Sequence, residues 1–161
     1  MMEIERKWLI DIDSIPYDLS KLDYLDIEQA YISFNPTIRI RKISNLNEYS
    51  LKIKSSSKDN GLSRQEYEIN ISEDEYNNLL SKKEGLTLSK TRYKVKQDKL
   101  LFEIDLFHKE YEGLAYMEIE FDSTEQANNY VAPSWVKREL TYDHNFTNAA
   151  LAKGLDIDVL K

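Results

Sequence analysis

The stretch Glu3-Ile4-Glu5-Arg6-Lys7 decides the fold, because it places a charged residue at every second position. Side chains two residues apart on a β-strand point to the same face of the sheet. Glu3, Glu5 and Lys7 therefore share one face, and Ile4 lies on the opposite face. A single strand of this kind indicates a half-buried sheet with its polar face in water.

The same alternation of charged and apolar residues recurs along the whole chain. It is found at 39–41, 51–54, 64–69, 90–95, 102–106, 117–122 and 137–139. Solvation of a surface does not require charge pairs this regular, and strands of both signs coexist here. We therefore expect an α+β, mainly β fold, built on a closed eight-stranded antiparallel β-barrel with a charged lumen and helices packed outside.

The lumen of such a barrel would carry basic and acidic side chains in equal number. The expected bases are Lys7, Arg39, Arg41, Lys52, Lys54, Arg64, Lys90 and Arg92. The expected acids are Glu3, Glu5, Glu66, Glu68, Glu103, Asp105, Glu118 and Glu120. Burying so many charges is costly unless they neutralise one another or bind a ligand.

A ligand of this lumen would have to suit both its basic and its acidic side chains. Arginine and lysine suit phosphate oxygens, and carboxylates without cysteine or histidine suit Mg²⁺ or Mn²⁺. A polyphosphate with a divalent cation satisfies both sets of side chains, so the pattern predicts phosphoryl or nucleotidyl chemistry. A self-neutralised network without ligand is the alternative.

Composition narrows the class of protein further. The 161 residues, with 22 Lys+Arg and 29 Asp+Glu, have a net charge of −7 and suit a single domain over residues 1–161. This acidity argues against binding along nucleic acid or an anionic membrane. There are no cysteines, which excludes disulfides and thiolate sites. With no apolar signal core at the N-terminus, we expect a cytoplasmic protein.

Local signals predict a few short helices between the strands. Capping boxes at 72–75 and 123–126 begin two of them, which we expect to end near Gly85 and before Pro133. A third is expected at 148–153, closed by Gly154, and a short helix or turn near 17–22. The run 55–61 is expected to be a loop that joins two strands.

Taken in order, the strand motifs resemble those of the CYTH superfamily, the triphosphate tunnel metalloenzymes. The ExExK motif opens the chain, and Arg39-Ile40-Arg41, Lys90-Thr91-Arg92 and Glu118-Ile119-Glu120 follow, together with further segments at 51–54, 64–68, 102–105 and 138–152. The resemblance spans residues 2 to 154. It implies an eight-stranded antiparallel tunnel, in agreement with the alternation of charged residues.

The resemblance also implies roles for the charged side chains. The phosphate-binding set is Lys7, Arg39, Arg41, Lys52, Lys54, Lys90 and Arg92, to which the strand alternation adds Arg64. The metal carboxylates are Glu3, Glu5, Glu118 and Glu120. Carboxylates that would support these or hold a second metal are Glu66, Glu68 and Asp105, to which the strand alternation adds Glu103 and Glu139.

Three residues are candidates for the chemical step. Glu5 would act together with the metal, and Lys90 could transfer a proton, because a lysine among cations can have a lowered pKa. Tyr31 shares its face with Gln29 and Ser33 and so reaches the lumen, although a packing role explains it equally well.

The compact form of the chain, with ExExK near its first residue, resembles the bacterial inorganic triphosphatases most. We therefore expect Mg²⁺- or Mn²⁺-dependent hydrolysis of the terminal phosphoanhydride of a small-molecule triphosphate, most simply inorganic tripolyphosphate. The alternatives are a class IV-type adenylate cyclase that makes cyclic AMP from ATP, and a thiamine triphosphatase or NTPase. Exposed strand or helix surface is also compatible with a homodimer.

Overall fold

The computed structural model describes residues 2–55, 59, 62–156 and 158. Most of the predicted loop at 55–61 therefore lies outside the described residues. The strands are β1 (Met2–Ile10), β2 (Asp23–Phe34), β3 (Thr37–Ile43), β4 (Glu48–Lys54), β5 (Ser63–Asn70), β6 (Glu84–Gln97), β7 (Leu100–Phe107), β8 (Ala115–Glu120) and β9 (Val136–Glu139). The α-helices are α1 (Glu73–Leu80), α2 (Thr124–Asn129) and α3 (Asn148–Ala152).

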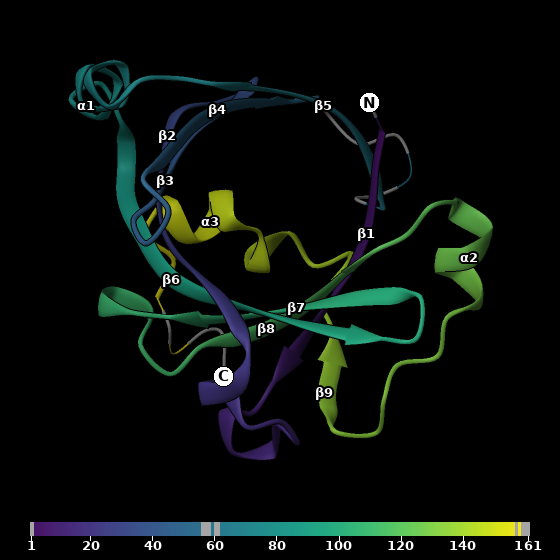
Figure 1. Cartoon of the computed structure of the whole chain (residues 1–161). Coiled ribbons are helices and arrows are strands. Elements are labelled where there is room, and N and C mark those ends of the chain that lie inside the picture. Colours follow the sequence, from purple (N-terminus) through teal and green to yellow (C-terminus); the bar gives the residue numbers. More distant parts are fainter. Residues whose placement is uncertain (1, 56–58, 60–61, 157, 159–161) are drawn as a thin grey trace.

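The strands form a closed antiparallel barrel, which Figure 1 views along its axis. The order is β5-β4-β3-β2-β6-β7-β8-β1, and β5 pairs back with β1 to close the ring. The two ends of strand β1 pair with different strands. Met2 to Ile4 pair with β5, whereas Trp8 to Ile10 pair with β9. The predicted eight-stranded barrel is thus confirmed, with β9 as an added strand.

Two helices cover the outer face of the barrel, as expected. Tyr76 of α1, 1% exposed, packs on Ala30 and Ile40 of β2 and β3. Ala127 of α2 packs in a second outer cluster that contains Trp8. These contacts bury the apolar side of the alternating strands and leave the charged side facing inward.

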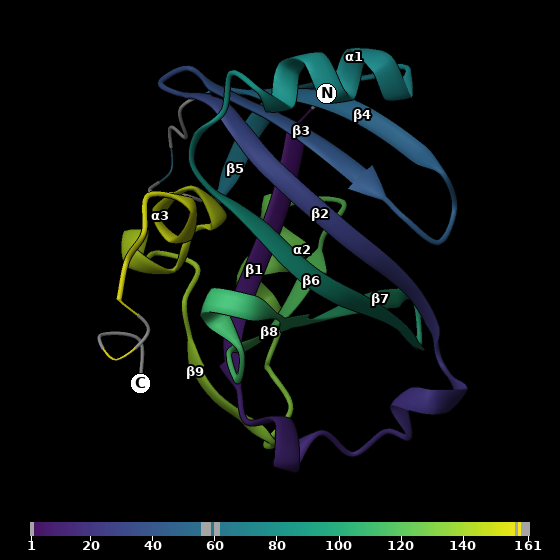
Figure 2. The same ribbon diagram turned by 90° about the vertical axis from the view of Figure 1, so that its left-hand side faces the viewer.

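Helix α3 occupies a different place, at one end of the barrel (Figures 1 and 2). Leu151 and Ala152 join a core cluster with Leu9, Tyr31 and Leu88, whose side chains face inward. The prediction that helices pack outside therefore holds for α1 and α2, whereas α3 covers the apolar end of the lumen.

The helix boundaries follow the predicted caps, with one correction. The reciprocal capping box of Ser72 and Glu75 begins α1, but the helix ends at Leu80, and Gly85 lies in β6. Gly85 has φ of +72°, and a Cβ there would collide with the Ala152 carbonyl oxygen. The glycine is required for the close approach of α3 to the strand and does not end α1.

The other expected helices and turns are present. Ser123 caps α2 through the Gln126 N–H, and α2 ends before Pro133. The Gln126 side-chain oxygen accepts from the backbone N–H of Asp122 and not from that of Ser123, so the predicted capping box is not reciprocal. Gly154, with φ of +94°, follows α3, and a 3₁₀ turn lies at 19–21. None of the helices in the described ranges is long and apolar enough to span a bilayer.

Candidate active site

Crowded carboxylates line the part of the lumen formed by β1 and β8. The register places Glu5 opposite Glu120 and Lys7 opposite Glu118. Burial, Glu118 and Glu3 together raise the pKa of Glu5 to about 7. Burial and the charges of Glu3 and Glu5 also raise the pKa of Glu120. These carboxylates repel one another, so a cation among them would be stabilised.

The donor chemistry of this group fits a hard divalent cation. Carboxylate oxygens are the ligands that Mg²⁺ and Mn²⁺ prefer. In the described part of the chain, no three His, Asp or Glu side chains already converge in a geometry that would hold a metal ion. Two properties make this group suitable for a divalent cation: its carboxylate oxygens and the mutual repulsion of its negative charges. The group consists of Glu3, Glu5, Glu118 and Glu120.

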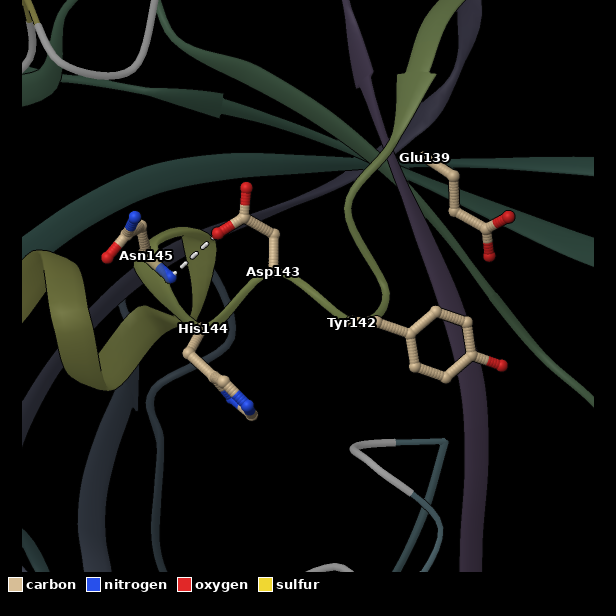
Figure 3. Close-up of a pocket in the computed structure, with 5 residues that line it drawn as sticks. All are labelled: Glu139, Tyr142, Asp143, His144 and Asn145. Atoms are coloured by element: carbon tan, nitrogen blue, oxygen red, sulfur yellow. Dashed lines mark hydrogen bonds between the residues drawn. The ribbon is translucent and has the colours of Figure 1, made fainter.

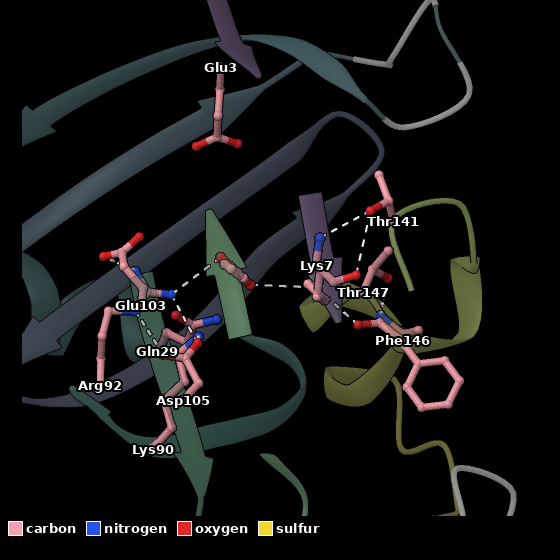
Figure 4. Close-up of polar contacts among 12 residues, drawn as sticks. Glu3, Lys7, Gln29, Lys90, Arg92, Glu103, Asp105, Thr141, Phe146 and Thr147 are labelled. Carbon is pink, nitrogen blue, oxygen red and sulfur yellow. Dashed lines mark hydrogen bonds and ion pairs between the residues drawn. The ribbon is translucent and has the colours of Figure 1, made fainter. Parts of the chain in front are cut away.

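A second group of charges lies between β6 and β7, and its members neutralise one another. Lys90, with a fully buried side chain, donates to Asp105 Oδ2 at 2.8 Å. Arg92 donates to both Asp105 oxygens, through Nε at 2.7 Å and Nη2 at 2.9 Å. Arg92 also lies 3.3 Å from Glu103 and 3.6 Å from Glu118. Figure 4 shows Lys90 and Arg92 meeting at Asp105.

The pKa values of this group follow from that pairing. Burial opposes ionisation of Asp105, but Arg92 and Lys90 outweigh it and hold the pKa of this carboxyl well below its usual range. Burial lowers the pKa of Lys90 to about 7, and nearby Arg92 contributes in the same direction. Asp105 is therefore the fixed counter-charge of two buried cations.

Across the lumen, no carboxylate of the described ranges forms an ion pair with the arginines of β3. Arg41 donates from Nη2 at 2.9 Å and from Nε at 3.2 Å to the neutral carboxamide oxygen of Gln29. Arg39 is 5% exposed, and its buried Nε and Nη2 have no hydrogen-bond partner among the described residues. Burial and the charge of Arg39 lower the pKa of Arg41 to about 9. The buried Nε and Nη2 of Arg39 thus lack a protein acceptor in the described part of the chain, and an anionic ligand would supply one.

Lysines of β4 face the carboxylates of β5 and β1. Lys52 lies 3.4 Å from Glu66 and 3.5 Å from Glu68. Lys54 donates to Glu3 Oε1 at 2.9 Å. Burial opposes protonation of Lys54, but neighbouring Glu5 and Glu3 raise its pKa. Both lysines therefore lie in the lumen, in contact with acids.

Lys7 joins the lumen to the segment that leads into α3. Its Nζ donates to the carbonyl of Phe146 at 3.1 Å and lies 3.6 Å from Glu118. The ammonium also sits 5.0 Å from the centre of the Tyr116 ring. Figure 4 shows Lys7 between the barrel wall and this C-terminal segment. The lysine of the ExExK motif is thus held on three sides.

A cavity of about 530 Å³ runs from the lumen to the segment around α3. Its wall contains several predicted site residues together with the first turn of α3. These lining residues include Glu5, Lys7, Tyr31, Arg39, Lys54 and Arg64 from the barrel, and Thr141, His144, Asn148 and Lys153 from the C-terminal part. Tyr31 stacks on Phe34, with ring centres 5.2 Å apart, so it both packs and lines the cavity.

One predicted site residue lies apart from the others. Glu139 accepts two bonds of 2.7 Å from Arg6, whose guanidinium also donates to the Ala127 carbonyl of α2 on the outside of the barrel. Glu139 lines a separate cavity of about 580 Å³, with Tyr142 and His144, shown in Figure 3. The structure therefore does not bring Glu139 together with the lumen carboxylates, because it faces outward on β9.

Sequence reasoning missed several residues of the cavity. His144, Asn148 and Lys153 carry no charge alternation, and only the packing of α3 against the end of the barrel brings them to the site. Gln29 was overlooked as a site residue although it shares its face with Tyr31. Strand alternation showed that Gln29 faces inward, but only the register of β2 with β3 places it opposite Arg41 in the lumen wall.

The structure is thus a closed barrel whose lumen combines crowded carboxylates with arginines that have no carboxylate partner among the described residues. The chain belongs to the CYTH domain family, which it matches over residues 1–145. The predicted resemblance is thereby confirmed.

Individual relatives are similar over nearly their full length. The inorganic triphosphatase of Nitrosomonas europaea is 37% identical, over 94% of this chain and 97% of the relative. That of Acetivibrio thermocellus is 33% identical, over 94% of this chain and 93% of the relative. A crystal structure of an inorganic triphosphatase superposes with a TM-score of 0.68 at 32% identity, and covers 96% of each chain.

Proposed function

We propose that this protein is a metal-dependent triphosphatase that hydrolyses the terminal phosphoanhydride of inorganic tripolyphosphate. The observation that carries the proposal is the buried pair Arg39 and Arg41, which face the lumen without a carboxylate partner among the described residues. Buried cations without counter-charge are costly, and a polyphosphate chain would neutralise them. The names and identities of the full-length relatives support the same activity.

The basic side chains of the lumen would have two roles in binding the triphosphate. Arg39, Arg41, Lys52 and Lys54 would bind phosphate oxygens and neutralise the charge that develops as the anhydride breaks. Lys7, Arg64, Lys90 and Arg92 would add to this positive field, with Lys90 and Arg92 held in place by Asp105. In each case the side chain already lies in the lumen or lines its cavity.

Glu3, Glu5, Glu118 and Glu120 would hold Mg²⁺ or Mn²⁺, with Glu66, Glu68, Glu103 and Asp105 supporting them or holding a second metal. When bound, such a metal polarises phosphate oxygens and lowers the pKa of bound water. Glu5 would orient the attacking water in line with the leaving group. Tyr31 would form the wall beside the terminal phosphate.

Phosphate release from tripolyphosphate, ATP and thiamine triphosphate, measured side by side with Mg²⁺ and with Mn²⁺, tests this function. We expect tripolyphosphate to have the highest kcat/KM and EDTA to abolish release. A preference for ATP of about tenfold, or about 1.4 kcal/mol in transition-state binding, would overturn the choice of substrate. Formation of cyclic AMP from ATP would instead identify a cyclase.

A matched pair of variants tests the role of the carboxylates. Glu5→Gln removes a lumen charge and should abolish metal-dependent release. Glu48→Gln removes a charge at the exposed start of β4 and should leave release unchanged. Equal activity in the two variants would contradict the assignment of Glu5.

A further inference from the structure

Gln29 of β2 is a fully buried amide in the middle of the lumen wall, with 0% of its surface exposed. Its oxygen accepts two N–H bonds from Arg41, at 2.9 Å and 3.2 Å. A guanidinium can only donate, so these bonds fix which end of the carboxamide faces Arg41. The amide nitrogen Nε2 consequently points away from Arg41, and in the described part of the chain it has no hydrogen-bond partner.

Among the described residues, no acceptor forms a hydrogen bond with Nε2. The strand register pairs Gln29 with Arg41 on one side and with Leu88 on the other, and places Lys90 as the next inward residue of β6. Asp105 accepts hydrogen bonds from Lys90 and Arg92 and none from Gln29. Figure 4 shows Gln29 within this group of charged side chains. A buried donor of this kind costs stability unless a ligand supplies the acceptor.

The neutral character of Gln29 also matters for Arg41. Asp105 orients Arg92 and neutralises it at the same time. Gln29 orients Arg41 through two bonds but leaves the positive charge uncompensated. A guanidinium that is fixed in direction and still charged is well suited to bind an oxyanion.

We propose that Gln29 is a substrate-positioning residue, which donates its Nε2–H to a phosphate oxygen and holds Arg41 aimed at the same phosphoryl group. The ligand class is a phosphate oxyanion, because only an acceptor can satisfy Nε2 together with the open Nε and Nη2 of Arg39. The inference rests on the proposed function for the identity of the reaction, but not for the presence of the anion.

Two substitutions test the role of the amide. Gln29→Met has a similar size but neither donor nor acceptor. Gln29→Glu keeps an acceptor for Arg41, removes the donor and adds a negative charge. The control is Gln97→Glu, which makes the same change in charge at the exposed end of β6. The measurements are KM and kcat for tripolyphosphate with Mg²⁺, the Kd of tripolyphosphate in EDTA by calorimetry, and the thermal unfolding temperature.

We expect both variants at Gln29 to raise KM and Kd by tenfold or more, which is about 1.4 kcal/mol of binding, and the Glu variant to be the weaker binder. A uniform binding contact raises KM more than it lowers kcat, whereas disruption of the lumen would lower kcat and the unfolding temperature. The control should match the wild type in every measurement. KM and Kd within twofold of the wild type in both Gln29 variants would overturn the proposal, and an altered unfolding temperature alone would assign Gln29 a structural role.

The two readouts separate this inference from the proposed function. If the wild-type chain releases no phosphate but binds tripolyphosphate, the triphosphatase proposal fails and the Kd values still decide the role of Gln29. If the wild-type chain neither releases phosphate nor binds tripolyphosphate, both proposals are overturned.

Discussion

The pKa of Glu5 couples the stability of the metal-free protein to pH, and Glu5→Gln removes this coupling. Burial, Glu118 and Glu3 raise the pKa from 4.5 to about 7 in the folded chain. The folded state therefore holds its proton more tightly than the unfolded state does. This stabilisation is fully present below pH 4.5 and is lost as the pH rises through about 7.

The size of the effect follows from the same values. The pKa of Glu5 differs between 4.5 in the unfolded chain and about 7 in the folded chain. At about 1.4 kcal/mol per pKa unit, this difference corresponds to about 3 kcal/mol of unfolding free energy. The amide introduced by Glu5→Gln does not titrate, so the variant should gain about 3 kcal/mol in unfolding free energy relative to the wild type between pH 4 and pH 8. The attraction of Lys54 and Lys7 for Glu5 already opposes the shift and is included in it.

Urea denaturation in EDTA at several pH values, followed by tryptophan fluorescence, measures this difference. Trp8 is 2% exposed and should report global unfolding. Glu48→Gln, at an exposed position, should run parallel to the wild type. Saturating Mn²⁺ should stabilise the wild type at pH 8 more than the Glu5 variant, because the proposed metal site requires the complete carboxylate set. Parallel profiles for the wild type and Glu5→Gln from pH 4 to 8 would refute the reasoning.

Three further substitutions test the packing of the barrel and the charges within it. Gly85→Ala should destabilise the chain by more than about 1 kcal/mol in thermal unfolding, because φ is positive and the new Cβ would collide with the Ala152 carbonyl. Ser72→Ala should cost about 1 kcal/mol in urea denaturation without affecting phosphate release, because it removes the cap bond to Glu75. Asp105→Asn should cost about 3–5 kcal/mol in urea denaturation, because it leaves two buried cations without their counter-charge; unchanged stability would contradict this assignment.

Strand alternation carried most of the prediction of the fold. Side chains at every second position of β1, β3 and β8 must share a face, so the inward placement of Glu3, Arg39 and Glu118 followed from sequence alone. Closure of the sheet was implied by the amount of charge that this face carried. The capping residues Ser72 and Ser123 were equally local signals, and both helices begin at them.

The parts that escaped prediction depend on contacts between distant segments. Glu139 sits on a four-residue strand whose face is set by its pairing with β1, where the register shifts between Leu9 and Ile10. Gly85 could be read as the end of a helix, because nothing in its neighbourhood shows that α3 packs against it. The location of α3 follows from the apolar residues at the inward positions of the strand ends, which a search for charged pairs overlooks.

The buried cations of the lumen fall into two groups, which differ in whether a carboxylate lies beside them. Lys90 and Arg92 are paired with Asp105 and Glu103, so they can be buried whether or not a ligand is present. Arg39 and Arg41 receive no carboxylate, and one neutral amide fixes the direction of Arg41. The buried arginines of β3 thereby present their charge on one wall of the barrel, opposite carboxylates that repel one another. The net charge of −7 is consequently compatible with the proposed triphosphate ligand, because the field in the lumen is set by these few enclosed groups and not by the surplus acids of the whole molecule.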